Sequence, residues 1–425
     1  MKWGRILAFG FLFFTLGSSL SVFHSFSQTV VRGGERYLLT HRRAEKSKFN
    51  IGPFSSFLGR NNIEGFRLGI GGETTPCFNK HFYIKGLASY GFKDEQYKYS
   101  GTLSWSFNGK DPGYEYGIRG LSFQYQYDIQ SLNEHFFPVV QRNIFLSFKR
   151  QQEDMMLYQR KGLLKYKQEL PTGFAAETWM FLQNDTPAGA LQFAVDDGAG
   201  NIKNVDSYNV AGVGLKVSYA KSDEPLRYGY TPNISLTFHR GIKDLLNGDY
   251  NYRYAELATH KTILLRFGQV SLNAKTGKIW GNVPFPLLII PNYNLSYGML
   301  QGGYSLMNQL EFINDKYVSF DMEMYFDGLL FGTIPGISEF KIREILTFSG
   351  LYGDLSFDKL PENKRELFIF PQTSRLMGKD PYLEAGIGLS ILDLFRIDYV
   401  RRLTYLDKPG ISESGFRFSL KLALK

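Results

Sequence analysis

The residues best suited to catalysis or metal binding in this chain are six histidines and a single cysteine. No two histidines have the i, i+4 spacing that puts two metal ligands on one helix face, and none lies in a G-x-S-x-G, H-E-x-x-H or P-loop motif. Cys77 has no partner for an internal disulfide and no metal-ligand spacing around it. We therefore expect no catalytic, cofactor or metal site. One alternative stays open, an enzyme whose residues meet across strands at a rim of the molecule.

Charged residues near the C-terminus form a second pattern that could carry chemistry. Arg396, Asp398 and Arg402 lie on one face of an alternating segment whose other face is apolar. Glu323 lies on the polar face of an earlier alternating segment. We predict that these four side chains form a charge cluster in a wet interior, in which the basic residues pair with Glu323 or with the nearby Asp321, with Glu323 and Arg396 as one candidate pair. Ion pairing is the simplest role of the cluster, and gating or ligand contact is the alternative.

The composition points to strands that are apolar on one face only. Aromatic residues make up 16% of the chain and glycines number 44, yet the mean hydropathy is −0.22. Membrane barrels combine these properties, because their strands face lipid on one side and a polar lumen on the other. The formal net charge is +9, of which Lys2 and Arg5 contribute two charges. The basic residues are spread along the chain, so nucleic-acid binding is not expected.

Period-two alternation of apolar and polar residues recurs along the chain. Residues 97–107 alternate throughout, and a tilted membrane-crossing strand needs about nine to eleven residues. Charges at alternate positions, as in 316–327, fit a water-filled lumen and not a sheet buried on both faces. A large soluble β-sandwich or propeller is the alternative, although no blade-length repeat is present. The sequence predicts an all-β, transmembrane antiparallel barrel of about sixteen strands, at 64–73, 80–92, 96–108, 114–128, 142–149, 155–169, 172–184, 206–220, 231–239, 250–266, 268–279, 316–327, 340–353, 380–391, 394–404 and 413–424.

The N-terminus has the features of an export signal. Two basic residues precede the apolar segment 6–16, which is too short for a typical membrane-spanning helix, and small residues follow at 25–27. We expect a signal peptide at 1–27, with an uncleaved anchor helix as the alternative. A short periplasmic lead segment is expected at 28–60 and the barrel at 61–425. This organisation predicts a Gram-negative outer-membrane protein with a periplasmic N-terminus, in contact with outer-membrane lipid and lipopolysaccharide.

The predicted connections differ in length on the two sides of the membrane. The three longest, 185–205, 280–315 and 354–379, all fall on the outer side if the N-terminus is periplasmic. Long outer loops and short periplasmic turns are usual in such barrels. Loop 280–315 contains the apolar run 287–290, which is unlikely to be left in water. We predict that this loop folds inward and narrows the lumen, with apolar and aromatic contacts holding it. An ordinary packed surface loop is the alternative.

Five segments resemble one outer-membrane family. The resemblance extends over roughly residues 50–425, and the family is catalogued as domain of unknown function 5686. Its members usually carry a carboxypeptidase-regulatory-like domain in front of the barrel, which residues 28–60 are too few to form. The segments are EGFRLGIGG (64–72), GIKDLLNGDYNYRYAEL (241–257), GKIWGNVPFPLLIIPN (277–292), YSLMNQLEFINDKY (304–317) and DYVRRLTYLDKPGISESGFRFSL (398–420).

The family in turn is distantly similar to BamA-type surface-antigen barrels, which assemble or translocate proteins. The resemblance implies sixteen strands, an inward-folded sixth outer loop and a late R-x-D-Y strand, here Arg396, Asp398 and Tyr399. BamA-type barrels carry an arginine at the loop tip that docks onto acidic residues of the twelfth and thirteenth strands. This chain has Tyr304, Ser305, Leu306 and Met307 at the tip. Ser349 stands at the second acidic position, so the usual docking contact is not expected.

Three hypotheses about function follow. The first is a non-enzymatic outer-membrane barrel that is an accessory or relative of the BamA-type assembly and translocation barrels. It would act with a separate periplasmic or outer-membrane partner protein. The second is a passive channel or solute transporter, which barrel size alone supports. The third is the rim enzyme mentioned above.

Overall fold

The computed structural model describes most of the chain after residue 46. The described residues are 47–52, 58–113, 115–134, 148–196, 201–221, 232–300, 302–336, 338–364, 367–392, 394–407 and 409–420. The expected signal peptide at 1–27 lies outside the described residues, as does most of the expected lead segment. Within the described ranges, no helix has the length and apolar character needed to span a bilayer.

Within the described ranges, strands make up nearly all of the regular structure, and the connections contain only short 3-10 helices. The strands are β1 (Phe49–Ile51), β2 (Leu58–Asn61), β3 (Gly65–Thr74), β4 (Phe82–Gly91), β5 (Gln96–Ser106), β6 (Arg119–Ser131), β7 (Met155–Glu169), β8 (Phe174–Gly189), β9 (Ala194–Asp196), β10 (Ile202–Asn204), β11 (Tyr208–Tyr219), β12 (Ile234–Gly241), β13 (Tyr252–Leu265), β14 (Gly268–Trp280), β15 (Lys316–Phe326), β16 (Arg343–Asp354), β17 (Tyr382–Ile391), β18 (Phe395–Arg402) and β19 (Ser414–Leu420). The 3-10 helices are η3 (Leu132–Glu134), η5 (Leu245–Asn247), η6 (Phe285–Leu287), η7 (Phe331–Thr333), η8 (Ser338–Phe340) and η9 (Phe357–Lys359).

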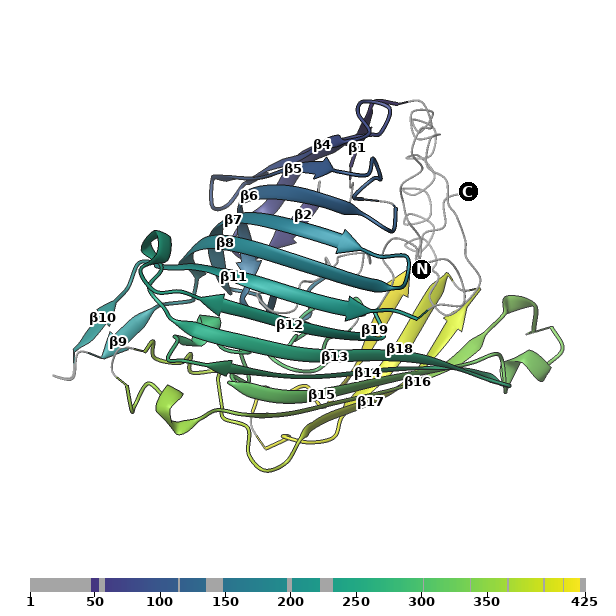
Figure 1. Ribbon diagram of the computed structural model, residues 1–425. Coiled ribbons are helices and arrows are strands. Elements are labelled where there is room, and N and C mark those ends of the chain that lie inside the picture. Colours follow the sequence, from purple (N-terminus) through teal and green to yellow (C-terminus); the bar gives the residue numbers. More distant parts are fainter. Residues whose placement is uncertain are drawn as a thin grey trace, which may run out of the picture.

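Seventeen of these strands form one antiparallel sheet, which curves round on itself (Figure 1). Each strand from β3 to β19 pairs with the next strand of the sheet along the chain, and the hairpin β9–β10 projects separately. β1 and β2 both pair with β3, at its two ends, and together occupy one position. The sheet therefore has sixteen strand positions, and the predicted transmembrane antiparallel β-barrel is confirmed.

Two strand predictions at the start of the barrel were wrong. Residues 142–147 of the strand expected at 142–149 lie outside the described residues, and Lys149 forms only an isolated bridge. β6 pairs directly with β7, so no barrel strand lies between them. Conversely, β1 and most of β2 precede residue 61, where we placed the start of the barrel. The two errors cancel in the total of sixteen.

The two ends of the barrel differ as the sequence predicted. The connections β8–β11, β14–β15 and β16–β17 all leave the same end, which we call the loop end. The opposite end, called the turn end, carries tight connections such as 170–173 and 266–267, together with the longer connections 220–233 and 327–342. The link between β6 and β7 also leaves the loop end, because β1 and β2 add one strand position before β3. The predicted strand list, which lacks that position, puts the same link, residues 129–141, on the periplasmic side.

The outer face of the barrel carries an apolar belt. A row of register partners crosses five strands, and its side chains are 39% to 55% exposed: Ile84, Leu103, Phe123, Leu164 and Met180. Exposed apolar side chains in a continuous row need a nonaqueous neighbour. Lipid supplies that neighbour for a membrane barrel.

Aromatic side chains border this belt on both sides. Tyr90, Tyr97 and Tyr99 lie toward the loop end, and Trp105 and Phe107 toward the turn end, with ring contacts within each group. Tyr97 and Trp105 are eight residues apart on β5. The span from one to the other matches the roughly nine to eleven residues that a strand tilted by about 45° needs to cross a bilayer. The outer face therefore has the dimensions of a bilayer crossing.

Two neighbouring residues on β5 test which face meets lipid. Leu103→Arg places a charge in the belt and should cost about 2–4 kcal/mol of unfolding free energy. Thr102→Arg places the same charge on the other face of the strand and should cost much less. Urea unfolding in lipid vesicles measures both variants. Equal losses would show that the two faces have been assigned wrongly.

Candidate functional site

The connection between β14 and β15, residues 281–315, lies inside the barrel, and we call it the lumen loop. Its two stems pair with each other, because Ile289 and Asn314 exchange backbone hydrogen bonds of 2.8 and 3.0 Å. Pro284 precedes η6 and sets an extended entry into that turn. The apolar run Leu287 to Ile290 is at most 1% exposed. The expectation that this loop folds inward is therefore confirmed.

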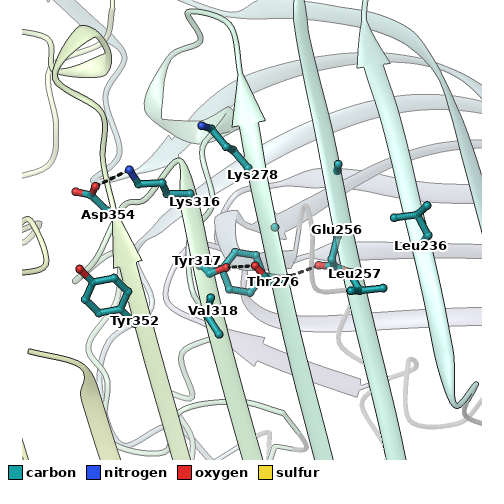
Figure 2. A pocket seen from close by; sticks show the side chains of 12 residues that line it. Leu236, Glu256, Leu257, Thr276, Lys278, Lys316, Tyr317, Val318, Tyr352 and Asp354 are labelled. Atoms are coloured by element: carbon teal, nitrogen blue, oxygen red, sulfur yellow. Dashed lines mark hydrogen bonds and ion pairs between the residues drawn. The ribbon is translucent and has the colours of Figure 1, made fainter.

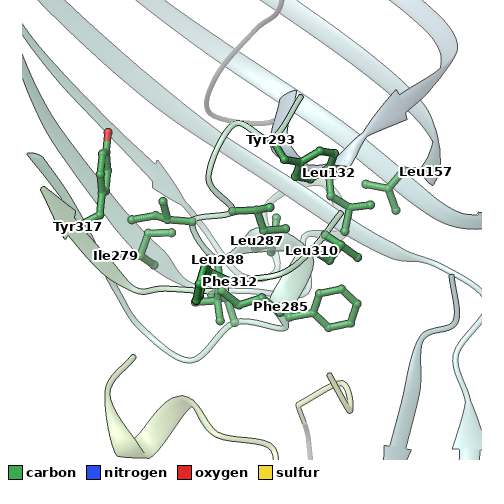
Figure 3. Close-up of a cluster of buried hydrophobic side chains, with 14 of the residues drawn as sticks. Leu132, Leu157, Ile279, Phe285, Leu287, Leu288, Tyr293, Leu310, Phe312 and Tyr317 are labelled. Atoms are coloured by element: carbon green, nitrogen blue, oxygen red, sulfur yellow. The ribbon is translucent and has the colours of Figure 1, made fainter. Parts of the chain in front are cut away.

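The lumen loop crosses the barrel and packs against both walls (Figure 3). Leu287, Leu288 and Leu310 lie between Ile279 and Tyr317 on one side and Leu132 and Leu157 on the other. Burying each such side chain stabilises the docked loop by roughly 1.5–3 kcal/mol. Aromatic side chains from two other loop-end connections, Phe193 and Phe368, stack at 4.8 Å in the same cluster. The loop thus shares one apolar core with the barrel interior.

A buried ion pair holds the descending half of the loop. Glu311 accepts two hydrogen bonds from Arg402 of β18, at 2.6 and 3.0 Å, and both side chains are 4% exposed or less. Arg375, from the connection between β16 and β17, donates to the same carboxylate at 2.5 Å. Arg402 also lies 4.6 Å from the centre of the Tyr382 ring. Paired, bidentate contacts of this kind are strong and directional.

The tip of the loop is held through its backbone. Glu384 of β17 accepts hydrogen bonds from the N–H groups of Ser305 and Leu306, at 2.8 and 2.7 Å. Arg417 of β19 donates to the Ser305 carbonyl oxygen. The tip segment Tyr304, Ser305, Leu306 and Met307 is therefore buried between the last strands, and the side chains at the tip do not form the charged contacts.

One segment of the lumen loop also extends the sheet at its last strand. Phe418 of β19 donates its N–H to the Tyr297 carbonyl and accepts from the Met299 N–H, both at 2.9 Å. Residues of an antiparallel strand direct their backbone bonds to alternate sides. These two bonds therefore lie on the edge of β19 that faces away from β18. On its other side, Tyr297 donates to the Phe148 carbonyl at 2.8 Å. Part of the β19 edge is thus covered by the chain's own loop.

The predicted charge cluster divides into two groups. Arg396 meets Glu323 at 2.6 Å and Asp398 at 2.7 Å, and it donates to the Tyr325 hydroxyl at 2.7 Å. These residues come from β15 and β18 and lie toward the turn end. Arg402 does not join them, because it lies at the other end of β18 and binds Glu311 of the lumen loop.

Sequence reasoning missed Glu311, Arg375, Glu384 and Arg417. Glu384 and Arg417 lie on inward faces of alternating strands, and that pattern could have marked them as lumen residues. Glu311 and Arg375 lie in irregular connections, where no periodicity marks an inward side. Among the described residues, no group of three His, Cys, Asp or Glu side chains could hold a metal ion.

Replacing Glu311 should release the lumen loop. Glu311→Gln leaves the buried Arg402 without its carboxylate and Arg375 with only the exposed Asp407, which should cost about 3–5 kcal/mol. We expect protease cleavage within 281–315 and raised conductance in planar bilayers. Glu323→Gln is the control, since it breaks the turn-end group and leaves the loop contacts intact. Equal protease resistance of the loop in parent and Glu311→Gln would contradict the anchoring role.

The same carboxylate predicts how docking depends on pH. Burial by itself raises the pKa of Glu311, but hydrogen bonds from Arg402 and the Asn308 N–H, with the charges of Arg402 and Arg375, hold it below its ordinary value. Because the pKa of Glu311 is lowered in the docked state, ionised Glu311 stabilises docking at every pH above the ordinary glutamate pKa of about 4.3. This stabilisation disappears as the pH falls through the lowered pKa. The loop should resist protease at neutral pH and become accessible only below about pH 4. Release of the loop at a pH between neutral and about 4 would contradict the anchoring role of Glu311.

Comparison with known proteins supports the fold and the family. The C-terminal domain of the family of unknown function DUF5686 matches residues 217–356, from the end of β11 to just beyond β16. A search of curated protein sequences gives no match. Among solved structures, the chain is similar to BamA from Haemophilus ducreyi lacking POTRA domains 1–3, with a TM-score of 0.54 and 11% identity. The similarity covers 95% of this chain and 77% of that one. At this identity it shows a shared barrel fold, and residues 217–356 carry the C-terminal domain of the DUF5686 family, as the resemblance in the sequence predicted.

Proposed function

We propose that the chain is a non-enzymatic outer-membrane β-barrel that takes part in the assembly or translocation of other proteins. The apolar belt and the two aromatic girdles support a location in a bilayer. The longest connections all leave one end, which supports an orientation with the loop end outside the cell and the N-terminus in the periplasm. The BamA-like fold and the DUF5686 match agree with this assignment, but they do not identify a substrate or a partner.

The observation that carries the proposal is the contact between the lumen loop and β19. An uncovered strand edge presents backbone N–H and C=O groups to any extended chain that can pair with it. In the docked state, Tyr297 and Met299 bind these groups at Phe418. Movement of the loop would expose this edge to a client polypeptide. A barrel whose loop covers and uncovers a strand edge is suited to handling extended chains.

A passive channel is the second candidate, and the docked loop argues against it. The apolar cluster across the lumen joins strand walls on opposite sides of the barrel. Buried charged contacts at Glu311 and Glu384 then hold the loop to the late strands. A steady open pore would require the lumen loop to leave the barrel interior while the channel conducts. Single-channel recording separates the two candidates, because a plugged barrel gives low or flickering conductance.

A disulfide across the β19 contact tests the proposal. Gly298 and Phe418 are bridge partners, so the double variant Gly298→Cys/Phe418→Cys should form a bond in the oxidising periplasm. Cys77, which is exposed, is first replaced by serine. In cells carrying only this variant, we expect other barrel proteins to fall in the outer-membrane fraction and to recover when reductant is added.

The matched control is Ile289→Cys/Asn314→Cys, which joins the loop stems without touching β19. This pair should leave the amounts of other barrel proteins unchanged. If neither disulfide alters them, the covered edge has no part in assembly. A steady conductance in the parent protein would then favour the channel.

A further inference from the structure

The outer wall formed by β12 to β16 has a depression in the apolar belt. It measures about 430 Å³ and lies on the face where Leu236, Leu257, Val318 and Tyr352 are exposed (Figure 2). The register places Leu236, Leu257, Thr276, Val318 and Tyr352 in one row across the five strands. Thr276 is the small member of that row, and Ala255 is the small residue of the next row toward the loop end. The bulky side chains of these rows therefore surround a hollow whose floor is formed by the small residues Thr276 and Ala255.

Basic side chains lie directly above this depression, toward the loop end. Lys278 and Lys316 are register neighbours, and Arg253 is the register partner of Trp280. Arg240 is paired in register with Arg253 on the neighbouring strand. Adjacent strands lie about 4.8 Å apart, so the four cations form one patch. Asp354, at 2.7 Å from Lys316, is the anion in these rows.

Three of these cations are available to bind an anion from outside the chain. Within the described part of the chain, Arg240, Arg253 and Lys278 form no ion pair, and the Lys278 ammonium lies 5.6 Å from the centre of the Trp280 ring. The pattern contrasts with the lumen, where Arg396 and Arg402 both meet carboxylates. Surface cations without a carboxylate partner, at the edge of an apolar belt, suit an anionic group at a membrane interface.

We propose that this face binds a lipid with a phosphate-bearing head group. One acyl chain lies in the depression between Leu257 and Val318, and the phosphate lies among Arg253, Lys278 and Arg240. Arginine and lysine are the usual partners of phosphate, and the apolar row accounts for an attached chain. The proposal rests on the membrane location given under Proposed function. It does not depend on a role in assembly.

The test uses the purified barrel in detergent and dioleoyl phosphatidic acid as the probe. Native mass spectrometry measures the fraction of protein with one lipid bound. Dioleoylglycerol, which has the same chains and lacks the phosphate, should bind much more weakly. Each interfacial cation contributes about 1 kcal/mol to binding of anionic lipid, so Arg253→Gln/Lys278→Gln should weaken binding by roughly 25-fold.

Two further variants separate the head-group and acyl-chain contributions. Lys261→Gln removes an exposed cation from the same strand, β13, near its turn end and should leave the affinity unchanged. Thr276→Leu fills the depression without altering charge and should also weaken binding. Unchanged binding in Arg253→Gln/Lys278→Gln, or displacement of the lipid by excess inorganic phosphate, would overturn the proposal. Because binding is measured in detergent, a failed assembly assay would not affect the result.

Discussion

The buried contact between Glu311 and Arg402 is the interaction on which the barrel interior depends. It joins an irregular loop to a regular strand, and both partners are removed from water. A buried ion pair of this kind adds little net stability compared with apolar residues, but losing one partner is costly. Its main effect is therefore to select one position of the loop. The apolar core around Leu287 supplies much of the burial, and the ion pair fixes where that core forms.

The polarity of this contact is the reverse of the docking contact described above for BamA-type barrels. There, an arginine on the loop docks onto acidic residues of the wall. Here the carboxylate of Glu311 is on the loop and the guanidinium of Arg402 is on the wall. Glu323 of β15, the twelfth strand position, binds Arg396 of β18. Compared with the BamA-type pattern, this loop is anchored with the charges exchanged and at different strands.

The sequence was most informative where alternation was long. β5 and β7 were placed to within a few residues, because strands of 11 and 15 residues repeat the period many times. β1 and β2, with three and four residues, are too short to show a period, and they were missed. The strand expected at 142–149 was a false alternation in a loop-end connection. Alternation also assigns side chains to the lumen without identifying their partners. Arg396 and Arg402 are about 20 Å apart along β18, but nothing in the sequence showed that Arg402 binds a loop residue, and alternation gave no information on Glu311.

Three charged anchors of the lumen loop follow it in the chain, whereas other contacts of the loop, such as those with Phe148 and Leu157, precede it. Glu384, Arg402 and Arg417 belong to β17, β18 and β19, and they are 79, 91 and 112 residues from their loop partners. These three charged contacts can form only when the last three strands are in place. A barrel cut short before β17 would keep the apolar core around the loop and lose the charged contacts that fix its position. Complete docking of the loop therefore depends on the C-terminal strands and reports within the molecule that they have been added.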